Sequence, residues 1–178
     1  MATPKAGASA IAKDDRTAPG LQKVTTFLWF DNNAEEAVNF YVSVFKNAKI
    51  LSTVRYGKVG PKPEGSIMII DFELDGQKLT ALNAGPEFKF TEAISLVVHC
   101  LDQQEIDYYW DKLSEGGQVL ECGWLKDKFG LAWQIVPEEF LDILRDSDTE
   151  TRDRGMAAMM TMKKLDIETL REAAKKTR

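Results

Sequence analysis

The chain has 178 residues, of which 44% are hydrophobic, so it can bury one core or two closely packed half-domains, and a multidomain enzyme is not expected. Its net charge is −5 and its Lys and Arg residues are scattered, so the basic stripe of a nucleic-acid-binding protein is absent. The apolar stretches are no longer than strands, and the first residues form no apolar signal segment, so we expect a cytoplasmic protein without membrane spans.

A polar tail and then a strand-helix unit open the chain. The first 21 residues are expected to be disordered, because they carry almost no large apolar side chains to offset the entropy of ordering. Residues 24–30 are β-branched and aromatic, as in a strand, and residues 31–33 are good helix caps. From Ala34 to Phe45, apolar residues recur at i, i+3, i+4 and i+7, which predicts a helix that packs on a sheet.

Three further strands are expected in the first half of the chain, over residues 50–56, 67–74 and 79–83. Asp75 and Gly76 lie between the last two strands. This pair takes up the positive φ angles of a tight hairpin turn at little cost, so the two strands are expected to be antiparallel neighbours.

The same order of elements then begins again. Residues 94–100 are expected to form a strand, and an apolar stripe from Ile106 to Leu113 predicts a second helix. Two more strands are expected over residues 118–124 and 131–136, and Gly123 can divide the first of them.

This repetition predicts two βαβββ modules, over about residues 22–86 and 92–137. Half-sheets of the same kind are expected to face each other across a cleft. The cleft is either a ligand site or a core filled with side chains.

Residues 146–178 are predicted to be a helical extension of a domain that spans residues 22–145. Pro137 can begin the helix that leads into the extension, and Asp166 can cap its last helix. A cluster of methionines lies at positions 156, 159, 160 and 162. Such a cluster can be an adaptable binding surface, but we favour an arm that packs on its own domain or on a second subunit, because its apolar faces must be buried somewhere.

Few side chains in the sequence suggest catalysis. His99 is the only histidine, and it is either a general base at the rim of the cleft or an ordinary histidine at a strand end, since no partner motif accompanies it. Cys100 and Cys122 lack the spacing of a metal site or a disulfide framework, so we expect buried thiols in a reducing compartment. The sequence has neither a Gly-x-Ser-x-Gly nucleophile elbow nor a phosphate-binding loop.

Several short motifs, taken in their order, resemble one family. They are Trp29-Phe30, Asn33 to Ala37 with Phe40-Tyr41, Leu82 to Pro86, Ile94-Ser95, Cys122 to Gly130 and Trp133 to Pro137. In this order they are similar to the PhnB-like branch of the vicinal oxygen chelate (glyoxalase/bleomycin-resistance) superfamily, over about residues 22–145. Members of this branch often carry the label 3-demethylubiquinone-9 3-methyltransferase.

The resemblance implies an α+β fold of paired βαβββ modules (glyoxalase/bleomycin-resistance-like) with C-terminal helices, commonly in a homodimer with a cupped sheet in each site. Metal-dependent relatives place His or Glu ligands on the first, fourth, fifth and eighth strands. In this sequence the resemblance puts Thr26, Thr80 or Ala81, Ser95 and Gln134 at those positions.

These side chains do not suit a catalytic divalent metal, which needs about three strong donors such as imidazole or carboxylate. We therefore expect neither a metal nor another cofactor. Neutral hydrogen-bonding groups can instead orient a small polar molecule in an apolar cup, or they can simply pair with one another. The expected pocket walls are Thr26, Leu28, Thr80, Leu82, Ser95, Val97, Trp124 and Gln134.

Three functions fit these features. The first is metal-independent binding of an unidentified small molecule by a homodimer that binds neither nucleic acid nor membrane. The second is an enzyme of the same superfamily, either glyoxalase-like or dioxygenase-like, or with the labelled methyltransferase activity. The third is a structural dimer whose cleft is filled. The Gly-rich strand-turn-helix unit that commonly binds methyl donors in a parallel sheet is not found in the sequence.

Overall fold

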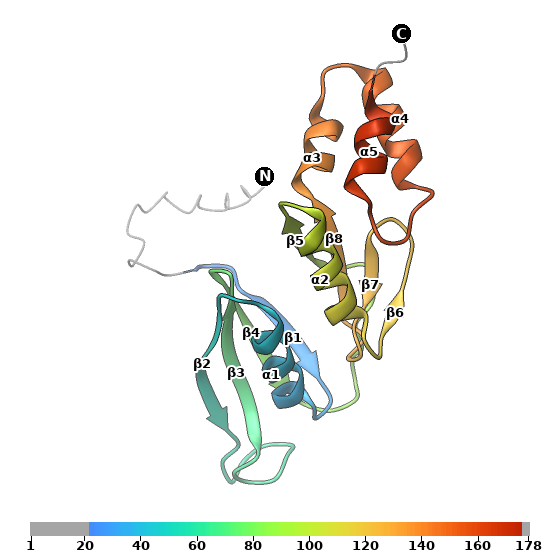
Figure 1. The fold of residues 1–178 in the computed structure, drawn as a ribbon. Coiled ribbons are helices and arrows are strands. Elements are labelled where there is room, and N and C mark those ends of the chain that lie inside the picture. Colours follow the sequence, from blue (N-terminus) through green and yellow to red (C-terminus); the bar gives the residue numbers. More distant parts are fainter. Residues whose placement is uncertain (1–21, 176–178) are drawn as a thin grey trace, which may run out of the picture.

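The computed structural model describes residues 22–175, which form two modules of one topology followed by three helices (Figure 1). In the first module, β1 (Thr26–Phe30), β2 (Ala48–Arg55), β3 (Ile67–Leu74) and β4 (Gln77–Asn83) form a sheet in the order β1-β4-β3-β2. Helix α1 (Ala34–Val44) packs its buried residues against one face of this sheet. The predicted disordered tail lies outside the described residues.

The second module repeats this arrangement. It consists of β5 (Ser95–Cys100), α2 (Gln103–Ser114), β6 (Gln118–Val119), β7 (Trp124–Lys126) and β8 (Ala132–Pro137), with the sheet order β5-β8-β7-β6. In each sheet the strand before the helix is parallel to the last strand of the module, and the other pairs are antiparallel. The predicted α+β fold with paired βαβββ modules and C-terminal helices is confirmed.

Residues with positive φ angles lie at two of the expected chain reversals. The hairpin between β3 and β4 turns at Asp75 (φ 43°) and Gly76 (φ 84°), as predicted. The predicted strand over residues 118–124 is divided into β6 and β7, and Gly123 has a φ of 80° just before β7. A Cβ atom at Gly123 would lie 2.9 Å from the carbonyl oxygen of Ile135, so glycine is required there for space as well as for conformation.

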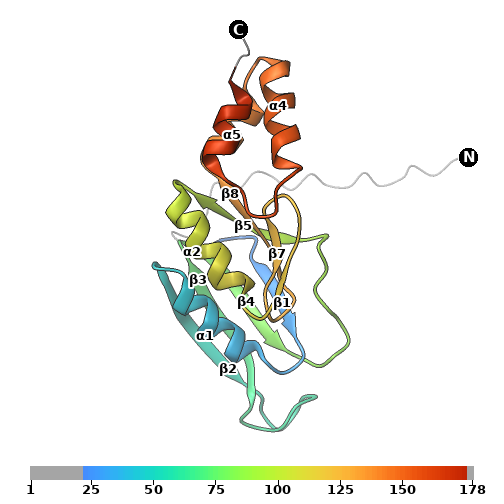
Figure 2. The ribbon, with the colours of Figure 1, turned by 45° about the vertical axis from the view of Figure 1, so that its right-hand side comes forward.

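The two modules meet through their helices. One hydrophobic cluster contains buried residues of α1, of α2 and of the helix-covered faces of both sheets. Within it, the Trp133 ring of β8 lies 5.5 Å from the Tyr41 ring of α1 and 5.7 Å from the Phe45 ring. Helices α1 and α2 lie side by side (Figure 1, Figure 2). We call the opposite side of each sheet its open face, because neither α1 nor α2 covers it; in the second sheet the C-terminal helices cover only its end at Val136.

It is the helix-covered faces, and not the open faces, that pack together in one chain. The sequence predicted half-sheets that face each other across a cleft but not which faces these are, and in the structure residues of both helix-covered faces line one cavity. The physical reason is that α1 buries its aromatic residues against the second sheet as well as against its own.

A buried carboxylate strengthens the contact between the modules. Asp127, in the turn after β7, is only 2% exposed. Its Oδ2 atom accepts hydrogen bonds of 2.8 Å from the Tyr41 hydroxyl and from the indole N–H of Trp133. Its Oδ1 atom accepts backbone N–H groups of Phe129 at 2.8 Å and Leu131 at 3.1 Å. Burial raises the pKa of Asp127, and burial together with this carboxylate raises the pKa of Tyr41 well above its ordinary value, so Tyr41 is a neutral donor.

The C-terminal helices α3 (Glu138–Arg145), α4 (Thr149–Met159) and α5 (Ile167–Ala174) form a second, smaller core with the end of β8. The segment before α5 is tied to the second sheet by backbone hydrogen bonds of 2.7 Å from Cys122 and Gly123. Asp166 caps α5, as predicted, by accepting the backbone N–H of Thr169. The extension therefore packs on its own chain. Of the four methionines, Met159 and Met162 pack against this core, whereas Met156 and Met160 are exposed.

Acid is expected to loosen this extension before the sheets. A hydrogen bond from Arg171 lowers the pKa of Glu139, and the Thr169 side chain lowers that of Asp166. A carboxyl group with a lowered folded-state pKa contributes stability above its unfolded pKa, and this contribution is lost as the pH falls through the folded value. Between pH 7 and about pH 3, hydrogen exchange corrected for intrinsic rates should therefore increase more in α5 than in β3. Equal loss of protection in the two elements would contradict this expectation.

Candidate functional site

Four of the predicted site residues lie together on the open face of the second sheet. Val97 on β5 and Trp124 on β7 are both register partners of Gln134 on β8, the strand between them. Ser95 lies on the same face of β5, two residues before Val97, and its hydroxyl oxygen accepts a hydrogen bond of 2.8 Å from Nε2 of Gln134. A neutral polar pair thus lies beside an apolar and an aromatic side chain.

Two other predicted residues, Thr80 and Leu82, lie on the open face of the first sheet. Their register partners on β1 are Phe27 and Trp29. Neither of these aromatic residues was among the predicted pocket walls, although alternation along β1 places them on this face. The indole N–H of Trp29 donates to the carbonyl oxygen of Gly85 at 2.8 Å, which fixes the ring at one end of the face.

The sequence analysis also missed Asp71, which is a charged group of this open face. Its two carboxylate oxygens accept hydrogen bonds of 2.7 Å, one from the Thr80 hydroxyl and one from the Ser52 hydroxyl. Period-two alternation along β3 could have found it, because its strand neighbours Ile70 and Phe72 are buried on the helix side.

Thr26 and Leu28 lie on the wrong side of β1 for the predicted pocket. Leu28 belongs to the core beneath α1, and Thr26 is the register partner of Leu79, which is also buried there. The sequence analysis chose the wrong set of alternating residues on β1, shifted by one position. In the structure the parallel pairing of β1 with β4 puts Phe27, and not Thr26, beside Thr80. A shift of one residue exchanges the two faces of a strand.

The structure brings the predicted residues together in two groups and not in one. The hydrogen bonds join Ser95 to Gln134 in the second sheet and Thr80 to Asp71 in the first. Because the helix-covered faces pack against each other, these groups lie on two separate open faces of one chain. A single ligand can contact both groups only if the open face of a first sheet lies against the open face of a second sheet.

His99 continues the open face of β5 beyond Val97. Its Nδ1 atom lies 2.6 Å from Oε1 of Glu138, the first residue of α3. The sequence gave no sign of a partner for this histidine, because Glu138 is far from it along the chain. The two residues come close because β8, which leads directly into α3, lies beside β5. The register of β5 with β8 pairs His99 with Val136, two residues before Glu138.

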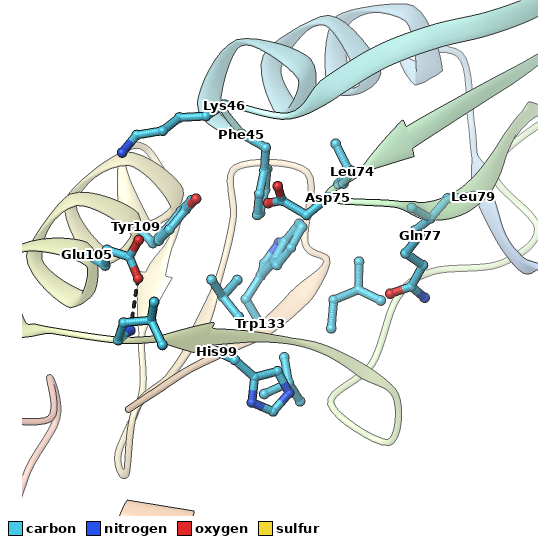
Figure 3. Close-up of a pocket in the computed structure, with 14 residues that line it drawn as sticks. Phe45, Lys46, Leu74, Asp75, Gln77, Leu79, His99, Glu105, Tyr109 and Trp133 are labelled. Atoms are coloured by element: carbon cyan, nitrogen blue, oxygen red, sulfur yellow. Dashed lines mark hydrogen bonds between the residues drawn. The ribbon is translucent and has the colours of Figure 1, made fainter. Parts of the chain in front are cut away.

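A cavity of about 510 Å³ lies between the modules on the helix side of β5 (Figure 3). The Phe45 and Trp133 rings form part of its lining, and Asp75, Glu105 and Tyr109 contribute polar groups. Burial raises the pKa of Tyr109 to about 12, so its hydroxyl stays protonated at neutral pH. Val97 and His99 of β5, an edge strand of the second sheet, also contribute to the lining, so the cavity reaches the edge of the open face of this sheet (Figure 3).

The residues present do not fit the metal that the superfamily resemblance suggests. Hydroxyl and amide groups are weak ligands, and the Ser95 and Gln134 side chains already bind each other. Over residues 22–175, no three His, Cys, Asp or Glu side chains gather closely enough to hold a metal ion. In the same part of the chain, none of the helices has the length and apolar character that a membrane span requires.

Cys100 is expected to be inert, and Cys122 is expected to be the reactive thiol. Cys100 is buried, as predicted, and burial raises its pKa to about 12, so almost no thiolate forms at neutral pH. Cys122 is only half-buried, so the prediction that both thiols are buried is wrong for this residue. A colorimetric thiol reagent should therefore modify at most one thiol of the folded chain and both thiols in denaturant. Rapid reaction of both thiols under native conditions would contradict this expectation.

Comparison with known proteins agrees with the fold described above. Residues 22–136 match a family described as 3-demethylubiquinone-9 3-methyltransferase. A putative 3-demethylubiquinone-9 3-methyltransferase, PhnB protein, from Bacillus cereus is 40% identical, with a TM-score of 0.60, over 65% of this chain and 99% of that chain. Among curated proteins no match was found.

Two more distant structures share the fold. Protein PA1353 from Pseudomonas aeruginosa is 20% identical, with a TM-score of 0.56, over 66% of this chain and 98% of that chain. The fosfomycin resistance protein FosX from Listeria monocytogenes is 12% identical, with a TM-score of 0.50, over 70% of this chain and 98% of that chain. Because the family match covers more than half of the sequence, the chain belongs to the 3-demethylubiquinone-9 3-methyltransferase family, in the PhnB-like branch of the vicinal oxygen chelate superfamily.

Proposed function

We propose that the chain is a metal-independent small-molecule-binding protein that works as a homodimer. In this dimer the open face of the first sheet of one copy meets the open face of the second sheet of the other copy. Each copy has one face of each kind, so a twofold axis produces two identical hollows. Large apolar side chains exposed on both faces support this arrangement, since Phe27 is 56% and Val97 is 43% exposed in one chain.

The pair formed by Ser95 and Gln134 carries the ligand-binding part of the proposal. Their mutual hydrogen bond leaves the Ser95 hydroxyl hydrogen as a donor and the Gln134 amide oxygen as an acceptor. Val97 and Trp124 flank Gln134 with apolar surface. A few fixed polar groups among apolar walls are typical of a pocket that orients a small molecule with one planar or apolar part.

The methyltransferase activity in the family's description gains no support from this geometry. Nucleotide-linked methyl donors are commonly held in the crevice of a doubly wound parallel sheet, beside a Gly-rich turn. Each four-stranded sheet of the described chain has a single parallel pair of strands, so neither is the parallel sheet of such a crevice. Ligand binding is therefore the function that we assign.

We also propose that the protein works in the cytoplasm and does not bind nucleic acid. Free thiols at both cysteine positions are consistent with a reducing compartment. A net charge of −5 without a basic stripe disfavours a nucleic-acid partner.

A thermal-shift screen of small polar metabolites tests the proposed function, with wild type, Gln134→Ala and Gln104→Ala compared. Gln104 is exposed on α2, so the same substitution there is a matched control. A ligand of the hollow should stabilise wild type and Gln104→Ala alike, and Gln134→Ala should weaken its binding about tenfold. Equal binding by all three chains would contradict the assignment. A crystal with the hollow filled by side chains would favour a purely structural dimer.

A further inference from the structure

We infer that Glu138 positions the imidazole of His99 and that His99 accepts a proton from a molecule bound in the hollow. The inference rests on the proposed function, because the open face of β5 becomes a wall of the hollow only in the dimer. It makes His99 the proton acceptor of the site and Glu138 a positioning residue.

His99 lies where a ligand of the hollow can reach it. Its side chain leaves β5 on the same face as Ser95 and Val97, because residues two apart along a strand point the same way. Its register partner is Val136, and that of Val97 is Gln134, so His99 is one pleat away from the polar pair. A molecule bound to Gln134 therefore needs to extend by about 7 Å, the length of two residues along a strand, to meet the imidazole.

The contact with Glu138 fixes which nitrogen of the neutral ring carries the proton. An ionised carboxylate can only accept hydrogen bonds, so at 2.6 Å the Nδ1 atom must be the donor. The lone pair of the neutral ring is then on Nε2. None of the hydrogen bonds within residues 22–175 involves this Nε2 atom. An imidazole base oriented by a carboxylate is the arrangement that activates proton acceptors in enzymes.

Stability does not account for this pair. The His99 side chain is 54% exposed and that of Glu138 is 41% exposed, and ion pairs at such exposure contribute little to folding. Glu138 is the first residue of α3. Its carboxylate lies where it orients the only histidine of the sequence.

The proton step defines the chemical class of the ligand. An O–H bond of the ligand breaks, its electron pair stays on the ligand oxygen, and the proton forms a new bond to Nε2 of His99. A neutral ligand and a neutral ring thus become an anion and an imidazolium, and the imidazolium is paired with the Glu138 carboxylate. A hydroxyl must be weakly acidic to give up its proton to imidazole. With Trp124 beside Gln134, a planar phenol or enol fits the site.

The first test is the tautomer of His99 in the full chain, observed in a long-range proton-nitrogen NMR spectrum. Because the sequence has one histidine, its signals need no assignment. At about pH 9, wild type should show the proton of the neutral ring on Nδ1. Glu138→Gln should lose this preference, and Glu139→Gln on the same helical turn should keep it. A wild-type spectrum with the proton on Nε2 would overturn the inference.

The second test compares para-nitrophenol, which has an acidic proton, with para-nitroanisole, its methyl ether. Wild type should bind the phenol as its coloured anion, and His99→Gln should weaken that binding about tenfold while changing binding of the ether less than about twofold. If both compounds bind wild type and His99→Gln equally, the hollow binds ligands without the histidine, so the inference fails and the proposed function stands. If wild type binds neither compound, the inferred ligand class is wrong.

Discussion

Replacing Asp127 with alanine is expected to lower the free energy of unfolding by about 3–5 kcal/mol, because several donors lose their acceptor at a cost of about 1–3 kcal/mol for each buried one. The substitution removes the acceptor of the Tyr41 hydroxyl and of the Trp133 indole N–H, together with that of two backbone N–H groups. Tyr41, Leu131 and Trp133 are buried at the contact between the modules, so their donors cannot turn to water. Urea unfolding at pH 7, followed by tryptophan fluorescence, measures the loss.

Three further chains show whether the loss arises from the hydrogen bonds. Asp127→Asn keeps the shape of the side chain but replaces one accepting oxygen with an NH₂ group. This group would face the N–H or O–H donors that the oxygen accepts, so the substitution should also be strongly destabilising. Tyr41→Phe removes one donor and should cost less, about 1–3 kcal/mol. Asp111→Ala, at an exposed position on α2, should change the free energy of unfolding by no more than about 0.5 kcal/mol. If Asp127→Ala is as stable as Asp111→Ala, the carboxylate does not join the modules.

A charge on the open face of the second sheet is expected to separate the proposed dimer. Val97→Asp would place a carboxylate among the apolar side chains of the interface, where burying it without a partner costs several kcal/mol. Since each 1.4 kcal/mol corresponds to a tenfold change, the dissociation constant should increase by at least about a hundredfold. Sedimentation velocity over a range of protein concentrations measures this change.

Val59→Asp is the matched control for this experiment. Val59 lies in the loop between β2 and β3 and is 92% exposed, so the same substitution there adds the same charge away from the open faces. Its dissociation constant should equal that of wild type. Unfolding of the dissociated Val97→Asp chain should also match that of a dissociated wild-type chain, because Val97 lies outside the core. If the two variants associate equally well, the open face is not the interface.

The parts of the fold that depend on neighbouring residues could be predicted from the sequence. The turn at Asp75-Gly76 depends on two residues, and the cap at Asp166 on the next three, so both predictions are confirmed. The duplicated order of elements also follows from local periodicity. Gly123 alone also indicated that the strand predicted over residues 118–124 would be divided.

The features that were missed depend on residues far apart in the sequence. The faces of β1 were exchanged because its parallel register with β4 is set by packing across the whole module, which no local pattern reports. Asp127 looked like an ordinary turn residue, although it is the buried acceptor between the modules. The partner of His99 was missed because Glu138 lies far along the chain, at the start of α3. Nothing in the spacing of the strands indicated that the helix-covered faces, and not the open faces, would pack together.

Cross-linking of two single-site variants tests most directly whether open faces of different copies meet. One chain carries Phe27→Cys on the first sheet, the other carries Val97→Cys on the second, and both carry Cys122→Ser so that only the inert Cys100 remains. After the chains are mixed, a short bis-maleimide should produce a species with twice the 20.0 kDa mass of one chain, containing one copy of each variant. If the mixture yields only single chains, or if Val59→Cys in place of Val97→Cys links equally well, the proposed hollow does not exist.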